Sequence, residues 1–297
     1  MKRTVDFSQN AANVFFHILT ACNLNCRHCY INPDQHGTGT LPISTIRDWL
    51  GIFATRHPNA NLIFLGGEPT LHPDLPEAVR IAKKLGFASI TVDSNGYLFH
   101  DFLSKTGADD LDYLSFSLDG ASPETNDPIR GKGCFDVCTA NIRNAKAHGF
   151  HTSLIYTVSR MNIDDLDNMP KLLEKLGIDR FFIQVIGIRG KSASGETALQ
   201  LSRNEWMTVI PKAAEAVAGL GIRVSYPKVF LEPDERFECA GKVADNYFIF
   251  PNGRVYRCPL CEDFPLNSMR LENNLLLENP KISEKDLFSL DISEGCV

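Results

Sequence analysis

The first 220 residues alternate between two hydrophobic patterns. Short apolar runs rich in β-branched and aromatic residues, which are typical of buried strands, are each followed by a stretch with apolar residues at helical spacing. The expected strands cover residues 14–19, 61–65, 88–92, 113–118, 153–158 and 180–186, and the helices after them cover about 44–53, 75–85, 101–105, 135–148, 164–176 and 204–220. Because parallel strands need crossover connections and bury both faces, these six units predict a parallel sheet covered by helices.

The number of strand-helix units favours an open barrel. Six units in about 210 residues fit an α/β fold of the partial (β/α)6 TIM-like barrel type better than a closed eightfold barrel. The pattern stops after Leu220, and the chain that follows is richer in Pro, Asn and Cys, with one hairpin expected around the Pro-Asn-Gly at residues 251–253. We therefore expect an N-terminal extension over residues 1–13, the barrel over 14–222 and a small cysteine-rich module over 223–297.

Composition adds limits on the class of protein. Apolar residues make up 43% of the 297 residues and charged residues 22%, which is ordinary for a globular chain with a sizeable core. The formal net charge of −6 argues against a general nucleic-acid binder or anionic-membrane binder, because such proteins carry a basic face. No apolar run approaches the roughly 18 residues of a membrane helix, and the first ten residues lack the apolar stretch of a secretory signal. We expect a cytoplasmic protein whose nine cysteines serve metal or redox chemistry rather than disulfides.

Three of the cysteines stand close together directly after the first expected strand. Cys22, Cys26 and Cys29 form the pattern C-x3-C-x2-C on a loop at the carboxyl ends of the strands, where parallel α/β folds bind their ligands. Three thiolates can hold three irons of a cubane cluster and leave the fourth iron open to bind a substrate. Two alternatives stay open at this point: a buried helical stripe of thiols, or a zinc site completed by His28 or His17.

The cysteine pattern at this place in a βα repeat resembles the radical S-adenosylmethionine (SAM) superfamily, and the resemblance covers about residues 13–220. In that family the three cysteines hold a [4Fe-4S] cluster, and its open iron is chelated by the amino and carboxylate groups of SAM. The resemblance implies an oxidoreductase or maturase that accepts one electron from an external donor, a ferredoxin or flavodoxin. That electron cleaves SAM to a 5′-deoxyadenosyl radical, which abstracts a hydrogen atom from the substrate.

A second motif stands at the end of the second expected strand. It consists of Gly66, Gly67, Glu68 and Pro69, followed by Thr70. Glycines let a backbone approach a ligand closely, and a carboxylate suits an ammonium group. In the radical SAM family a motif like this one contacts the amino group of SAM. The alternative is an ordinary strand-to-helix turn.

Polar residues also follow the later strands. By resemblance, the candidates for the ribose and carboxylate of SAM, with the arginine as partner of the carboxylate, are Ser94, Asn95, Ser117, Asp119 and Arg130. The alternative for each is turn chemistry, because Asn-Gly and Asp-Gly are common turn formers. Tyr156, Gln184 and Arg189 come near the ends of the fifth and sixth strands, where substrate or adenine would lie.

A second group of cysteines lies in the C-terminal part of the chain: Cys239, Cys258, Cys261 and Cys296. Their spacing around the expected hairpin resembles the auxiliary-cluster modules of radical SAM enzymes, called SPASM or twitch domains. Four thiols imply one auxiliary [4Fe-4S] cluster of the twitch kind, and the alternative is a structural zinc knuckle. The remaining pair, Cys134 and Cys138, stands one helical turn apart among apolar residues and is expected to pack in the core.

The substrate is the least defined part of the prediction. The resemblance favours maturation of a ribosomally made peptide or of a cofactor precursor. Because only 13 residues precede the first expected strand, we expect a separate protein to recognise such a peptide. The alternatives are a dehydrogenase, epimerase or rearrangement enzyme for a small molecule and, from another class, a non-enzymatic zinc-binding or electron-transfer protein.

Overall fold

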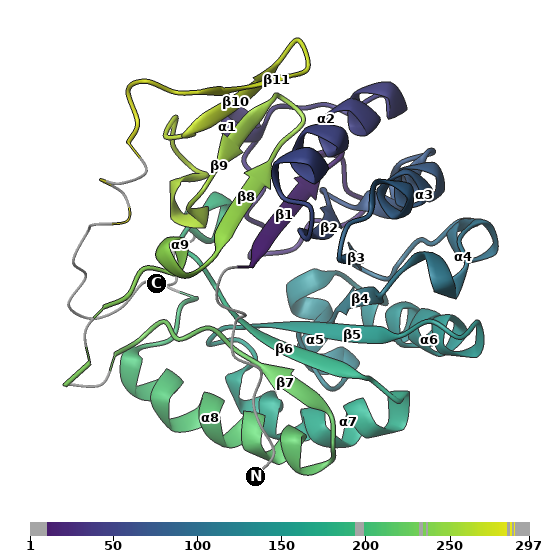
Figure 1. Cartoon of the computed structure of the whole chain (residues 1–297). Helices are drawn as coiled ribbons and strands as arrows, with labels where there is room; N and C mark the ends of the chain where they lie inside the picture. The colour runs from purple at the N-terminus through teal and green to yellow at the C-terminus, as the bar shows by residue number, and fades with distance from the viewer. Residues whose placement is uncertain are drawn as a thin grey trace.

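A single 11-stranded sheet forms the centre of the molecule in the computed structural model, which describes residues 11–193, 199–231, 234, 235, 237–283, 286 and 288. The strand order is β11-β10-β9-β8-β1-β2-β3-β4-β5-β6-β7, and all neighbours from β8 to β7 are parallel (Figure 1). These parallel strands are β8 (Asp245–Ile249), β1 (Ala12–His17), β2 (Asn61–Leu65), β3 (Ser89–Ser94), β4 (Tyr113–Ser117), β5 (Thr152–Val158), β6 (Arg180–Val185) and β7 (Arg223–Ser225). The predicted partial barrel is confirmed.

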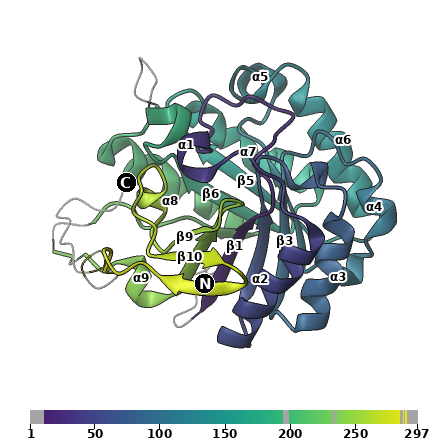
Figure 2. The ribbon, with the colours of Figure 1, turned by 90° about the horizontal axis from the view of Figure 1, so that it is seen from above.

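Helices cover the outer side of the curved sheet (Figure 2). The longer ones are α2 (Ile43–Arg56), α3 (Leu75–Leu85), α5 (Pro123–Arg130), α6 (Cys134–Ala147), α7 (Met169–Leu176) and α8 (Arg203–Gly219), and the short ones are α1 (Pro33–His36), α4 (Phe102–Lys105) and α9 (Ala240–Val243). Glycines in the left-handed conformation, Gly86 and Gly177, end α3 and α7 as expected. The helix expected from residue 164 begins later, because Ile163–Asn168 forms a 3-10 helix and Pro170 sits in the first turn of α7.

Side chains of the strands alternate between the helix-covered face and the inner face. In β1, Phe16 is fully buried and its ring lies 6.2 Å from that of Trp49 in α2, whereas Phe15 faces inward and stacks on Phe248 of β8 at 4.6 Å. In β3, Val92 is buried and its neighbour Asp93 is only partly buried. The period of two therefore gives the sheet an apolar outer face and a mixed inner face.

A ladder of polar side chains crosses the amino ends of four strands. Asn13 donates to Asn246 at 2.9 Å, Asn61 donates to Asn13 at 2.9 Å, and Ser89 donates to Asn61 at 2.8 Å. These contacts pin the register of β8, β1, β2 and β3, because a slip by one residue would move every member to the other face.

The C-terminal part continues the same sheet. β8 pairs in parallel with β1, and β9 (Arg254–Tyr256), β10 (Met269–Glu272) and β11 (Leu275–Glu278) follow in antiparallel order. The expected hairpin is confirmed as β8 and β9. β7 pairs with β6, so the parallel order runs past residue 222, where the sequence predicts a domain boundary. Among the described residues, no helix is long and apolar enough to span a bilayer.

Candidate functional site

The loop with the first three cysteines lies on the carboxyl ends of β1 and β2. Cys22 is exposed, and Cys26 and Cys29 are partly buried. The backbone fixes the loop, because Gly67 N donates to Leu19 O at 3.0 Å and Glu68 N donates to Ala21 O at 2.9 Å. The segment forms turns and irregular structure, so the alternative of a buried helical stripe is wrong.

The two glycines of the second motif make this close contact possible. A Cβ on Gly67 would lie 2.2 Å from the carbonyl oxygen of Ala21, and a Cβ on Gly66 would lie 2.7 Å from the side chain of Leu19. No side chain fits at such distances, so the motif seats the cysteine loop directly on β2.

Glu68 is buried, and its carboxylate accepts hydrogen bonds from several donors of the chain. They come from Thr70 N at 3.1 Å, Thr70 Oγ1 at 2.7 Å, Ser94 Oγ at 2.9 Å and Asn95 N at 2.7 Å. Burial raises the pKa of Glu68, and these hydrogen bonds oppose that rise. The carboxylate therefore ties the end of β2 to the end of β3.

Asn95 continues this connection to the cysteine loop. Its Nδ2 donates to Asn23 Oδ1 at 2.9 Å and lies 3.7 Å from Cys22 Sγ. The Nδ2 of Asn23 is buried and has no acceptor in the described part of the chain. An unpaired buried donor beside a thiol fits an anionic group bound at the thiols, since that group would accept the missing hydrogen bond.

Asp119 and Arg130 pair with each other in this structure. Asp119 Oδ2 lies 2.7 Å from Arg130 Nε and 3.4 Å from His28 Nε2, and Asp119 Oδ1 accepts from Thr157 N at 2.8 Å. The Arg130 carbonyl in turn lies 3.9 Å from Cys26 Sγ. These contacts anchor the loop to α5 and β5. Sequence reasoning considered His28 only as a zinc ligand and missed this role.

The zinc alternative finds little support at this loop. Both ring nitrogens of His17 are engaged, one with Ile249 O at 3.0 Å and the other with Tyr30 Oη at 2.7 Å. Within the described ranges, no three His, Cys, Asp or Glu side chains converge on one point as a single ion requires. The thiolates of a cubane cluster bind separate irons, so their sulfur atoms lie farther apart than the ligands of a single ion.

The three thiols influence one another electrostatically. Burial raises the pKa of Cys22 to about 11, and Cys26 and Cys29 add to the rise. Burial also raises the pKa of Cys26. Metal ligation requires thiolates, so binding at this loop must release protons.

Two of the remaining predicted residues are engaged by other groups of the chain. Tyr156 is fully buried, its hydroxyl donates to Asn162 O at 2.6 Å, and its ring packs on Phe181, so the prediction that it contacts substrate or adenine is wrong. Arg189 forms an ion pair with buried Glu262. Gln184 is half-buried and pairs with Thr157 in the β5–β6 register, whereas Ser117 is half-buried at the end of β4.

Asp93 is a candidate that the sequence reasoning missed. It lies near the carboxyl end of β3 on the inner face, opposite Ser115 of β4, which hydrogen-bonds to it. Burial raises the pKa of Asp93 to about 7. The alternation of β3 could have revealed it, because a carboxylate at an inward position of a barrel strand faces the ligand side.

The C-terminal cysteines are only partly brought together. Cys258 and Cys261 flank a short turn, where Cys261 N donates to Cys258 O at 3.0 Å, and a hydrogen bond between their side chains lowers the pKa of Cys258 to about 6. Cys239 is half-buried on a separate segment that leads into α9, and Cys296 lies outside the described residues. The last pair, Cys134 and Cys138, is buried on α6, and of the two Cys138 belongs to the apolar core as expected.

Comparisons with known proteins identify the family. The family model of the radical SAM superfamily matches residues 17–173, which is more than half of the chain. The chain is 32% identical over 199 residues to the Fe-coproporphyrin III synthase of Methanosarcina barkeri, covering 64% of this chain and 48% of that relative. It is 27% identical over 276 residues to the mycofactocin maturase MftC of Mycobacterium ulcerans, covering 87% and 70%.

Solved structures show the same fold. The Streptococcus suis protein SuiB, in its complex with the precursor peptide SuiA, superposes with a TM-score of 0.67 at 15% identity, covering 96% of this chain and 64% of that one. The chain spans about half the length of curated relatives such as the synthase.

The chain belongs to the radical SAM superfamily. Membership of this family speaks against the alternative of a non-enzymatic zinc-binding or electron-transfer protein. The residues present also fit the cofactor, since three free thiols and an unpaired amide donor lie together on a loop at the carboxyl ends of the strands.

Proposed function

We propose that the chain binds SAM at the carboxyl ends of β1 to β4 and uses it to abstract a hydrogen atom from a peptide or peptide-derived cofactor precursor. The observation that carries this proposal is the seating of residues 19–21, which lead directly into the loop of Cys22, Cys26 and Cys29, on the backbone of Gly66 and Gly67. A [4Fe-4S] cluster on these thiols supplies the electron that generates the 5′-deoxyadenosyl radical.

The chain's own residues then bind and orient SAM. We assign the motif from Gly66 to Pro69 to its amino group, with Glu68 acting through the backbone it holds, because its carboxylate is already engaged. Ser94, Asn95 and Ser117 are assigned to the ribose and carboxylate. Asp119 and Arg130 support the loop from the other side, and Arg130 reaches the SAM carboxylate only by exchanging its Asp119 partner.

The C-terminal cysteines are proposed to hold one auxiliary [4Fe-4S] cluster. Cys258 and Cys261 supply the pair that the fold brings together, and Cys239 and Cys296 complete the set. A cytoplasmic setting, with a ferredoxin or flavodoxin as electron donor, fits cysteines that serve metal binding, because a reducing compartment prevents disulfide formation.

The peptide substrate is favoured by the relatives. MftC is named as a maturase, and SuiB is solved with its precursor peptide. The match to MftC covers 87% of this chain and so extends into the C-terminal part. The match to the Fe-coproporphyrin III synthase covers 64% of this chain. We propose that a separate recognition protein presents the peptide.

A small-molecule substrate is the second candidate. The 32% identity to the Fe-coproporphyrin III synthase exceeds the 27% identity to MftC, and that relative is named for a tetrapyrrole product. This candidate would make the chain a dehydrogenase, epimerase or rearrangement enzyme.

One anaerobic experiment tests these assignments. The reconstituted protein is assayed for iron and sulfide and then given SAM and dithionite, and 5′-deoxyadenosine is measured. The proposal expects about eight irons and product formation, and about four irons with no product after Cys22, Cys26 and Cys29 are replaced by Ala. Deuterium transfer into 5′-deoxyadenosine from labelled precursor peptide, and none from labelled tetrapyrrole, decides the substrate class. The reverse transfer pattern would favour the second candidate.

A further inference from the structure

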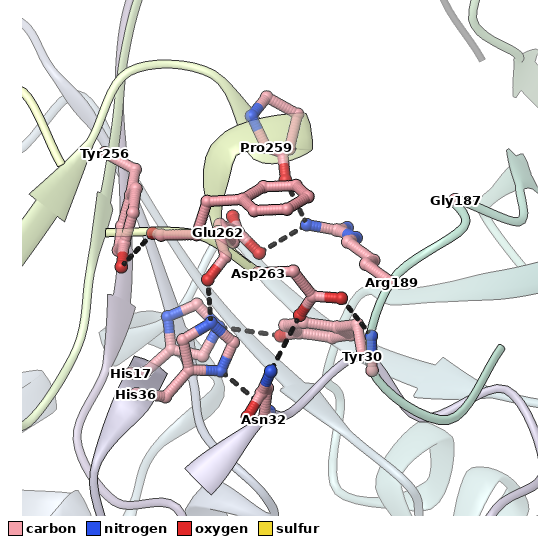
Figure 3. Close-up of polar contacts among 12 residues, drawn as sticks. His17, Tyr30, Asn32, His36, Gly187, Arg189, Tyr256, Pro259, Glu262 and Asp263 are labelled. Carbon is pink, nitrogen blue, oxygen red and sulfur yellow. Dashed lines mark hydrogen bonds and ion pairs between the residues drawn. The ribbon is translucent and has the colours of Figure 1, made fainter. Parts of the chain in front are cut away.

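Three segments that are far apart in the sequence meet beside Cys29. They are the segment after the first cysteine loop, the loop after β6, and the turn that carries Cys258 and Cys261 (Figure 3). Lys191 N donates to Cys29 O at 2.9 Å, and a Cβ on Gly190 would lie 2.5 Å from the same oxygen. The loop after β6 therefore packs directly on the backbone of the third cysteine.

Arg189 contacts both cysteine loops with one side chain. Its guanidinium lies 4.7 Å over the ring of Tyr30, the residue that follows Cys29. The same group donates to Pro259 O at 3.1 Å and forms an ion pair with Glu262, which is 1% exposed. A carboxylate buried this deeply depends on its charged partner, so loss of Arg189 would destabilise the turn that holds Cys261.

Neighbouring hydrogen bonds strengthen the same junction. Asp263 accepts from Gly190 N at 2.6 Å and from Asn32 Nδ2 at 3.3 Å, and the carbonyl of Glu262 lies 3.1 Å from His36 Nε2. Cys261 also shares a small apolar core with Phe250 and Tyr256, against which Tyr30 and Ile31 pack. Polar and apolar contacts thus join the two cysteine loops.

We propose that the Arg189–Glu262 pair is a positioning pair that couples the two cysteine sites. It holds the Cys258–Cys261 turn against the segment from Cys29 to Asn32, so that a change at either site is transmitted to the other. The consequence for catalysis rests on the proposed function, in which the C-terminal thiols carry a metal cluster. The sequence-based expectation that Arg189 contacts substrate or adenine is replaced by this role.

Thiol alkylation in the metal-free full chain tests the positioning role without any catalytic readout. Iodoacetamide labelling, followed by mass spectrometry, gives a rate for each cysteine in the wild type and in the Arg189→Met and Glu262→Gln variants. We expect the rates of Cys261 and Cys29 to rise about tenfold, because the junction encloses Cys261 and holds the backbone of Cys29 in place. Cys138, which is buried elsewhere, and exposed Cys22 keep their rates.

Two further variants serve as controls. Lys146→Met removes an ion pair of 2.9 Å with Asp179 at the amino end of the sheet and leaves all these rates unchanged. Arg189→Lys keeps the charge and restores part of the protection of Cys261. Faster labelling of Cys261 with no change at Cys29, or no change at either, would overturn the coupling.

Electron paramagnetic resonance of the reconstituted enzyme tests the coupling itself. The double replacement Cys258→Ala/Cys261→Ala is made in the wild-type protein and in the Glu262→Gln variant. In each protein we record the part of the paramagnetic resonance spectrum that changes when SAM is added. We expect the double replacement to change this part in the wild type and to add nothing when Glu262 is already replaced. Equal changes in both backgrounds would show that the sites are independent. Iron analysis showing a single cluster would contradict the proposed function, while the alkylation rates would still test the junction.

Discussion

The two groups of cysteines reach their positions by different routes. Cys22, Cys26 and Cys29 lie on one loop, whose place is set by hydrogen bonds to the strands on either side. Cys258 and Cys261 depend instead on β8 and β9, and β8 reaches the site only by pairing with β1. The first group is thus defined by local spacing and the second by tertiary structure, which explains why a sequence motif is sharper for the first.

Replacing single cysteines by Ala should separate the two groups most strongly. Loss of Cys22, Cys26 or Cys29 is expected to reduce 5′-deoxyadenosine formation to background, because the missing thiolate is one of the three proposed to hold the SAM-binding cluster. Loss of Cys258 or Cys261 is expected to remove about half of the iron and to leave SAM cleavage measurable. Iron analysis and chromatography of the nucleoside products check both. If the Cys258→Ala variant also lost the iron bound by Cys22, Cys26 and Cys29, the two groups of cysteines would not be independent metal sites.

Gly67→Ala tests whether the first group depends on backbone contact. The new Cβ must displace the Ala21 carbonyl, so we expect a loss of about 1–3 kcal/mol in the free energy of unfolding and a marked loss of SAM cleavage. Gly51→Ala in α2 is the matched control, since nothing lies within 4 Å of its Cβ position, and it should gain up to about 1 kcal/mol. Chemical unfolding and the nucleoside assay measure the two effects. Equal outcomes for both variants would count against the contact.

Asp93→Asn tests whether the inner face beside the first group is enclosed. Burial raises the pKa of Asp93 from 3.8 to about 7, so between these values the folded state keeps a proton that the unfolded state has lost. Stability from this group is therefore highest at acidic pH, falls as the pH rises towards about 7, and then levels off. The variant should lack this fall and gain about 1–2 kcal/mol relative to the wild type between pH 4 and pH 8, less than the full shift implies because the carboxyl is only partly buried. Unfolding curves of the metal-free proteins at both pH values would show no such difference if Asp93 were solvated.

The smallest effect is expected from the cysteines outside both groups. Cys134→Ala and Cys138→Ala remove buried packing atoms and should cost about 1 kcal/mol each. Iron content and SAM cleavage should stay at the wild-type level. A loss of iron in either variant would add that cysteine to a metal site.

The sequence predicts the parallel part of the fold well because its signals are local. Each strand is apolar, each helix repeats at helical spacing, and glycines such as Gly86 mark helix ends. Pairing between distant strands leaves no such signal. From the sequence, the C-terminal strands are expected to form a separate module. In the structure, β8 pairs with β1 and continues the barrel sheet.

Within the site, the sequence identified which residues gather at the carboxyl ends of the strands but did not predict their partners. The sequence pattern assigns Arg130 to the carboxylate of SAM, whereas in the structure Arg130 pairs with Asp119. An arginine at a helix end can reach a carboxylate of the chain as well as one of a ligand. Tyr156 was assigned to the ligand side, yet it shares the outward parity of Leu154 and lies in the core. The alternation of side chains along β3 and β5 would have placed Asp93, and not Tyr156, on the ligand side of the sheet.

The pairing of β8 with β1 has a consequence for the order of events during biosynthesis. Asn13 and Asn246 are 233 residues apart, and a contact of such long range forms late in folding. A nascent chain emerging from the ribosome therefore presents the first strand with one bare edge until most of the polypeptide has been translated.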